Sequence, residues 1–132
     1  MKNAVIYVRV RTTLNPQEEI ERQKALCLQF AKEKGLSIVD YYIDIEELGK
    51  PSHRVALSQM IDDCAISTWD TVIISDMDRL TRNIATYSKY CKKLEQHGRS
   101  LLIASSSDNE LLQNIIEWNY EILKEMSERR KK

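Results

Sequence analysis

The fold of this chain is decided by the stretch AVIYVRVR at residues 4–11. Its first five residues are apolar without interruption, and this pattern predicts a strand over residues 4–8 that is buried on both faces, as in a parallel sheet. Arg9 and Arg11 then interrupt the apolar run at the carboxyl end of the strand. A charge at such a place is costly unless it is paired or meets an anion. The stretch therefore predicts a central strand with a polar site at its end.

Strand and helix patterns alternate along the rest of the chain. Further strands are predicted at residues 36–43, 71–75 and 100–104, and a polar loop at residues 44–53. Helices are predicted after Asn15, after Ser52, over residues 83–96 and over about 107–130. This order predicts an α/β fold with a mainly parallel four-stranded sheet flanked by helices and a long C-terminal helix. We expect a single domain over residues 1–132.

Local signals mark the ends of the first two helices. Asn15 is predicted as an N-cap, Pro16 suits the first helical position, and Glu18 completes a capping box. Gly35 is predicted to end this helix. Ser52 is a candidate cap for the second helix, whose apolar positions are Leu57, Met60, Ile61 and Cys64.

Composition narrows the class of protein. The 132 residues include 20 basic and 20 acidic side chains, so the formal net charge is zero and a generally polycationic nucleic-acid coat is excluded. A local basic site is not excluded, because only the local potential matters there.

No apolar run approaches the roughly 20 residues that span a bilayer, and we expect a cytoplasmic protein without membrane contact. The three cysteines are predicted to be buried free thiols, with neither a disulfide nor a metal site.

Arginines are the candidate functional residues. Five of the nine fall at or just beyond predicted strand ends, where open α/β sheets bind ligands: Arg9, Arg11, Arg54, Arg79 and Arg82. Asp78 stands beside two of them and is a candidate to hold a guanidinium in place. A guanidinium binds phosphate through two parallel hydrogen bonds and keeps its charge. The alternative is an arginine–aspartate network that pins loops, together with solvated surface arginines.

Four short motifs in register resemble the catalytic domain of the serine recombinases, the family of resolvases, invertases and large serine integrases. They are YVRV-x-T at residues 7–12, QKAL at 23–26, a glycine followed by an arginine at 49 and 54, and DRL-x-R at 78–82. The resemblance covers roughly residues 3–104. It implies a reaction in which a serine hydroxyl attacks a DNA phosphodiester, strands are exchanged within a tetramer, and no metal or cofactor takes part.

The resemblance also implies roles for single residues. Asp78 matches a carboxylate that positions arginines, and Gln23 matches a structural glutamine of the first helix. The phosphate-binding arginines of the family are matched by Arg9, Arg54, Arg79 and Arg82.

The departures from the family pattern concern the site itself. The position of the nucleophilic serine is Arg11, which cannot attack a phosphodiester. A second serine is replaced by Leu48, a lysine by Asp76, and a proline by Val55. Two hypotheses follow: a recombinase enzyme domain in altered form, or a non-catalytic module that keeps the phosphate site or the helix interface to regulate a recombinase or mobile element. The departures favour a chain that is inactive as written.

The last predicted helix has an apolar stripe with two interpretations. It packs on its own sheet, or it joins a second copy, as the resemblance implies, to give a homodimer or higher oligomer. The stripe consists of Leu111, Ile115, Trp118, Ile122 and Met126. No DNA-binding domain is recognised within residues 1–132, so contact with DNA is expected to be weak, salt-dependent and made to the phosphate backbone.

Overall fold

The structure is a computed structural model, and it describes residues 2–11, 15–46, 54–76, 79 and 84–105. The predicted C-terminal helix (about 107–130) lies outside the described residues. So do Leu48, Gly49, Asp78 and Arg82, which the sequence also singled out.

The described strands form one parallel sheet in the order β2-β1-β3-β4. The strands are β1 (Lys2–Arg11), β2 (Leu36–Glu46), β3 (Thr71–Ile74) and β4 (Ser100–Ile103). This arrangement confirms the predicted four-stranded parallel sheet. The short, fully buried β3 and the apolar first half of β1 lie at its centre, as their uninterrupted apolar sequences predict.

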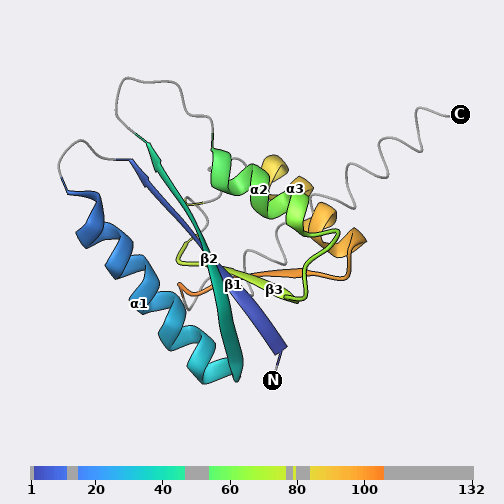
Figure 1. Ribbon diagram of the computed structural model, residues 1–132, viewed down its shortest axis with the longest axis horizontal. Coiled ribbons are helices and arrows are strands. Elements are labelled where there is room, and N and C mark those ends of the chain that lie inside the picture. The colour runs from blue at the N-terminus through green and yellow to red at the C-terminus, as the bar shows by residue number, and fades with distance from the viewer. Residues whose placement is uncertain (1, 12–14, 47–53, 77–78, 80–83, 106–132) are drawn as a thin grey trace, which may run out of the picture.

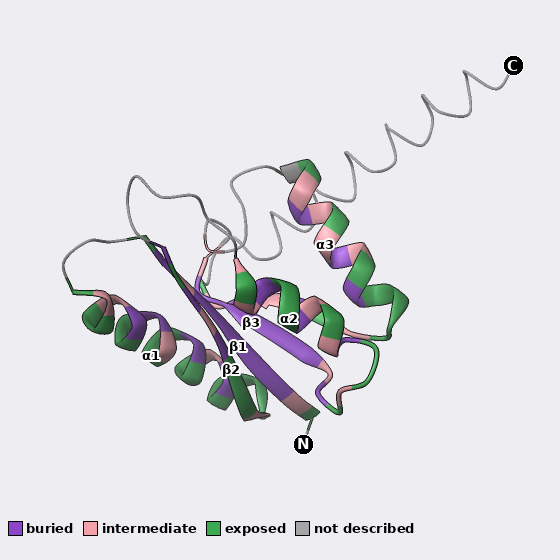
Figure 2. Ribbon diagram, turned by 45° about the horizontal axis from the view of Figure 1, so that its top comes forward, coloured by how far each residue is buried: buried purple, intermediate pink, exposed green. Residues whose placement is uncertain are grey.

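Helices cover both faces of the sheet (Figure 1). They are α1 (Pro16–Lys34) on one face, and α2 (Val55–Asp63) and α3 (Ile84–Gln96) on the other. Side chains alternate between the faces along β1, so Ile6 and Val8 pack toward α1, whereas Val5 and Tyr7 pack toward α2 and α3. In Figure 2 the buried residues of each helix face the sheet. The result is a three-layer α/β/α arrangement with a core on each side of the sheet.

The first two strands are much longer than the other two. β1 has 10 residues and β2 has 11, whereas β3 and β4 have 4 each. β3 pairs only with residues 4–6 of β1, so the second half of β1 extends beyond it. This unequal length leaves the carboxyl end of β1 flanked by a strand only on the β2 side, and the site lies there.

The second strand runs further than predicted. Residues 44–46, assigned from the sequence to a polar loop, continue β2 and pair with residues 9–11 of β1. The loop prediction was therefore wrong for Asp44, Ile45 and Glu46. Two of these positions are acidic yet buried, because their carboxylates find hydrogen-bond donors on other elements. The predicted third and fourth strands end one residue earlier than expected.

Helix ends agree only in part with the local signals. Pro16 opens α1, and Gly35 ends it with a left-handed φ of 68°, as predicted. Asn15 stands at the N-cap position, but its side chain makes no cap hydrogen bond, so the predicted capping box is not formed. Glu18 instead adds a negative charge to the first turn, where it interacts favourably with the helix dipole. The proposed cap Ser52 lies outside the described residues.

The three cysteines are buried and free, as predicted. Cys27 packs between α1 and the sheet, while Cys64 and Cys91 pack in the core on the other face. Burial raises the pKa of Cys27 to about 12, which keeps this thiol protonated and unreactive. No helix among the described residues is long and apolar enough to cross a membrane.

Candidate functional site

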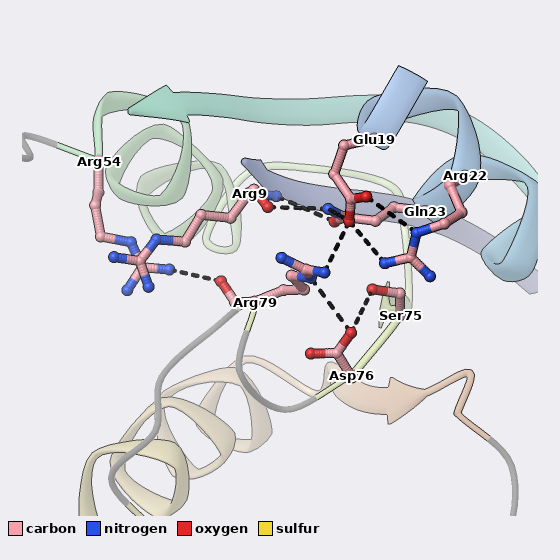
Figure 3. Close-up of polar contacts among 8 residues, drawn as sticks. All are labelled: Arg9, Glu19, Arg22, Gln23, Arg54, Ser75, Asp76 and Arg79. Carbon is pink, nitrogen blue, oxygen red and sulfur yellow. Dashed lines mark hydrogen bonds and ion pairs between the residues drawn. The ribbon is translucent and has the colours of Figure 1, made fainter. Parts of the chain in front are cut away.

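The candidate site lies at the carboxyl ends of β1 and β2, beside the first turns of α1 and α2 (Figure 3). The ends of parallel strands meet at one edge of a sheet, so the topology alone brings these segments together. The structure places Arg9, Arg11, Arg54 and Arg79 here. Arg82 and Asp78, which the sequence also indicated, lie outside the described residues.

Arg9 is held at both its side chain and its backbone. Its Nε and Nη2 donate to the two carboxylate oxygens of Glu46 at 2.9 and 3.1 Å, which is the bidentate fork that arginine forms with planar anions. Glu46 also forms an ion pair with Arg11, in which Arg11 Nε lies 3.4 Å from Glu46 Oε2. The carboxylate therefore lies between two arginines that share one face of β1.

The backbone N–H and carbonyl of Arg9 are hydrogen-bonded to Gln23 of α1. The side-chain amide of Gln23 accepts the Arg9 N–H at 3.3 Å and donates to the Arg9 carbonyl at 3.0 Å. These two groups lie on the part of β1 that β3 does not reach, and Gln23 satisfies them as a neighbouring strand would. This geometry gives a physical reason for the structural role that the resemblance implied for Gln23, which is fully buried.

Arg79 is bound by two carboxylates from different elements. Its Nη2 donates to Glu19 of α1 at 2.8 Å, and its Nε donates to Asp76 at 3.3 Å. Sequence reasoning offered Asp78 for this role, and within the described residues Asp76 and Glu19 perform it. Asp76 also accepts a hydrogen bond from the buried Ser75 hydroxyl at 3.1 Å. The segment after β3 is thereby tied to the first turn of α1.

Glu19 is the junction of this network. It accepts hydrogen bonds from Arg22 at 2.6 and 3.0 Å, from Gln23 at 3.2 Å and from Arg79. The hydrogen bonds from Arg22, followed by those from Gln23 and the charge of Arg79, lower the pKa of Glu19 to about 2. Through Gln23 and Glu19 the structure joins the backbone of Arg9 to the guanidinium of Arg79.

Arg54 enters the site from the start of α2. Its Nη2 donates to the Tyr7 hydroxyl and to the Arg79 carbonyl, both at 3.0 Å. Its backbone has a left-handed φ of 42°, a conformation that costs a non-glycine residue about 1 kcal/mol and persists where surrounding contacts hold it. The contact with the Arg79 carbonyl places the Arg54 guanidinium against the backbone of Arg79.

Tyr7 and Asp44 form a buried pair beneath Arg54. The Tyr7 hydroxyl donates to Asp44 Oδ2 at 2.7 Å. Asp44 also accepts the backbone N–H groups of Ala56 at 2.8 Å and Leu57 at 3.1 Å, and so caps α2 from another element. Burial, together with the hydrogen bond to Asp44, raises the pKa of Tyr7 above its ordinary value. Tyr7 therefore remains a neutral donor.

Four acidic or phenolic groups of this site were missed by sequence reasoning. The sequence did contain one signal for two of them, because Asp44 and Glu46 alternate with the apolar residues Ile43 and Ile45, as in a half-buried strand. Tyr7 stands in the YVRV-x-T motif but was assigned no role there, and no local pattern indicates a role for Glu19. The missed residues are Tyr7, Glu19, Asp44 and Glu46.

The arginines are arranged to bind a planar or tetrahedral anion. In this structure carboxylates of the chain itself pair with them. The four arginines supply fixed positive charges, and Glu19, Glu46 and Asp76 occupy edges of three of the guanidiniums. Among the residues that the structure describes, no group of three or more His, Cys, Asp and Glu side chains is arranged to hold a metal ion.

The family comparison matches residues 4–132 to the family described as "Resolvase, N terminal domain". No curated protein sequence matches the chain.

Solved structures resemble the fold. A resolvase family site-specific recombinase from Streptococcus pneumoniae aligns with a TM-score of 0.74 and 22% identity, covering 99% of this chain and 93% of that one. The N-terminal catalytic domain of TP901-1 integrase aligns with a TM-score of 0.70 and 23% identity, covering 95% and 98%. The C-terminal catalytic domain of ISC1926 TnpA, an IS607-like serine recombinase, aligns with a TM-score of 0.65 and 28% identity, covering 87% and 78%.

Proposed function

Since this chain belongs to the resolvase N-terminal domain family, we propose that it binds the phosphate backbone of DNA with its arginines and does not itself cleave the strand. The proposal keeps the substrate class of the family and removes the covalent step. It describes a recombinase-type domain that acts by binding, in the setting of site-specific recombination.

The observation that carries the proposal is the ion pair between Arg11 and Glu46. By resemblance, residue 11 is the position of the nucleophilic hydroxyl, and here it bears a guanidinium fixed beside Arg9. A guanidinium remains protonated and has no nucleophilic atom to offer a phosphodiester. Phosphoryl transfer without a positioned nucleophile does not proceed, whatever charge stabilisation the other arginines supply.

The binding half of the proposal rests on the arginines that converge at one end of the sheet. Arg9 and Arg79 are joined through Gln23 and Glu19, and Arg54 contacts the Arg79 backbone. We assign phosphate contacts to Arg9, Arg54 and Arg79, and extend them to Arg82 with Asp78 as its positioning carboxylate. Because these contacts neutralise phosphates and release counterions, affinity falls steeply as salt rises.

Self-association completes the proposal. The apolar stripe of residues 107–130 is the surface assigned to a homodimer or higher oligomer. A second copy doubles the number of phosphate contacts along one duplex, and linked sites bind more tightly than either site alone.

Two measurements test the two halves separately. Incubation with supercoiled plasmid followed by denaturing gels is expected to reveal neither nicking nor a protein–DNA adduct. An adduct that maps to Thr12 or Thr13 would contradict the proposal, because these are the hydroxyls next to the position of Arg11. Fluorescence anisotropy with a short duplex at low ionic strength is expected to show salt-dependent binding that Arg9→Ala weakens by about tenfold.

The variant Arg11→Ser tests whether a hydroxyl is all that the site lacks. It is expected to remain inactive, because Leu48 and Asp76 also depart from the family pattern and Glu46 still occupies Arg9. Strand nicking with a phosphoserine adduct at residue 11 of this variant would show that the remaining arginines are arranged for catalysis.

A further inference from the structure

Glu46 presents to Arg9 the same pair of acceptors that a phosphate would present. Arg9 Nε and Nη2 reach separate oxygens of the Glu46 carboxylate, at 2.9 and 3.1 Å. A phosphate group binds this edge of a guanidinium in the same way, with two parallel N–H···O bonds. One edge of a guanidinium cannot serve a carboxylate and a phosphate together.

The position of Glu46 is fixed by the sheet. It stands opposite Arg11 in the register of β1 and β2, and its side chain is only 7% exposed. The Arg9 side chain is 18% exposed, and the Arg11 side chain is 61% exposed. Glu46 thus lies beneath Arg11 and against Arg9, at the inner end of the arginine cluster.

We infer that Glu46 is an internal occupant of the Nε/Nη2 edge of Arg9, so that DNA phosphate binds this edge of Arg9 only by displacing the Glu46 carboxylate. This inference rests on the proposed function, because it concerns the same arginines and the same phosphate. The contact between Glu46 and Arg9 is then autoinhibitory, because it holds the Arg9 side chain in position while lowering its affinity for phosphate. The competing interpretation is that Glu46 only positions Arg9, and it predicts the opposite effect of removing the charge.

The decisive variant is Glu46→Gln, which keeps the size and one acceptor oxygen of the side chain but removes its charge. If Glu46 competes with phosphate, this variant binds a short fluorescein-labelled duplex at least about tenfold more tightly than the unchanged chain at low ionic strength. The matched control is Glu33→Gln. Glu33 is exposed in the last turn of α1 and bonds only to Gln29 among the contacts of the described residues, so this variant makes the same change in net charge away from the site.

The same substitution in an Arg9→Ala background tests whether the gain in duplex affinity acts through Arg9. In Arg9→Ala the change Glu46→Gln is expected to lose most of its effect, because the edge that it frees is absent. A gain of the same size in both backgrounds would overturn the inference, since it would reflect only the general potential of the site. Binding by Glu46→Gln that is equal to or weaker than that of Glu33→Gln would also overturn it, and weaker binding would identify Glu46 as a positioning residue.

The unchanged chain offers a test that needs no folded variant. Sulfate titrated into labelled protein is expected to shift the NMR signals of the Arg9 Nε–H group and the Glu46 carboxyl carbon together. A shift of Arg9 without one at Glu46 would contradict displacement. If neither the unchanged chain nor Glu46→Gln binds the duplex at all, the proposed function fails with the inference. If the unchanged chain binds and Arg9→Ala binds more weakly, the proposed function stands whatever Glu46 does.

Discussion

Asp44, at the end of β2, caps α2 by accepting the backbone N–H of Leu57 at 3.1 Å. The same carboxylate accepts the N–H of Ala56 and the hydroxyl of Tyr7. One buried side chain therefore fixes where α2 begins, and with it the direction in which Arg54 enters the site. The helix takes its cap from a strand 13 residues earlier in the chain.

Replacement of Asp44 by alanine is expected to lower the free energy of unfolding by about 3 kcal/mol, because it removes a helix cap and leaves a buried Tyr7 hydroxyl without its acceptor. Urea unfolding followed by circular dichroism measures this loss. The control is Asp62→Ala on the exposed side of α2, expected to change stability by less than about 0.5 kcal/mol. Equal effects of the two variants would contradict the role given to Asp44.

Replacement of Gln23 by alanine is expected to expose the backbone of Arg9. The N–H and carbonyl that Gln23 now bonds would lose their partners, at a cost of about 2–3 kcal/mol in unfolding free energy. Native-state hydrogen exchange reports the change directly as faster exchange of the Arg9 amide. Gln29→Ala, on the exposed face of the same helix, is the matched control, and an unchanged Arg9 amide in Gln23→Ala would refute the prediction.

Acid is expected to loosen the link between α1 and the segment after β3. The pKa of Glu19 in the folded protein is lowered to about 2 from an ordinary value of 4.5, chiefly by the hydrogen bonds from Arg22. A lowered folded-state pKa adds stability above the unfolded value, and this stability is lost as the pH falls from about 4.5 through about 2. Unfolding free energy measured across this range should slope downward less steeply in Glu19→Gln and in Arg22→Ala. Unchanged slopes in both variants would argue against the network.

Self-association is expected to depend on residues 107–130. Sedimentation of the unchanged chain should show a concentration-dependent dimer or higher oligomer, because contact with a second copy would bury the apolar stripe. Trp118→Ala or Ile122→Ala should shift the equilibrium toward monomer by removing buried apolar area. The exposed change Glu33→Gln on α1 serves as control. A monomer at all accessible concentrations, in every variant, would remove the interface from the proposal.

Local patterns in the sequence predicted most of the architecture. The apolar run of residues 4–8, the alternation of strand and helix patterns, and the stop at Gly35 each act over a few neighbouring residues. Such patterns report directly on secondary structure, because backbone conformation and the burial of one face are decided locally. They also located the arginines at strand ends, since parallel strands bring their carboxyl ends to one edge whatever the loops between them do.

Only the tertiary structure decided which groups the arginines meet. Glu46 binds Arg9 from 37 positions away, and Glu19 binds Arg79 across 60. No periodicity records contacts at that separation. The same distance explains the error over Asp44 and Glu46, which are charged but buried because donors from β1 and α2 satisfy their carboxylates. The sequence alone determined the sheet, its helices and the end of the sheet where charge gathers. The fold determined how that charge is paired, because the burial of a carboxylate depends on donors supplied by other elements.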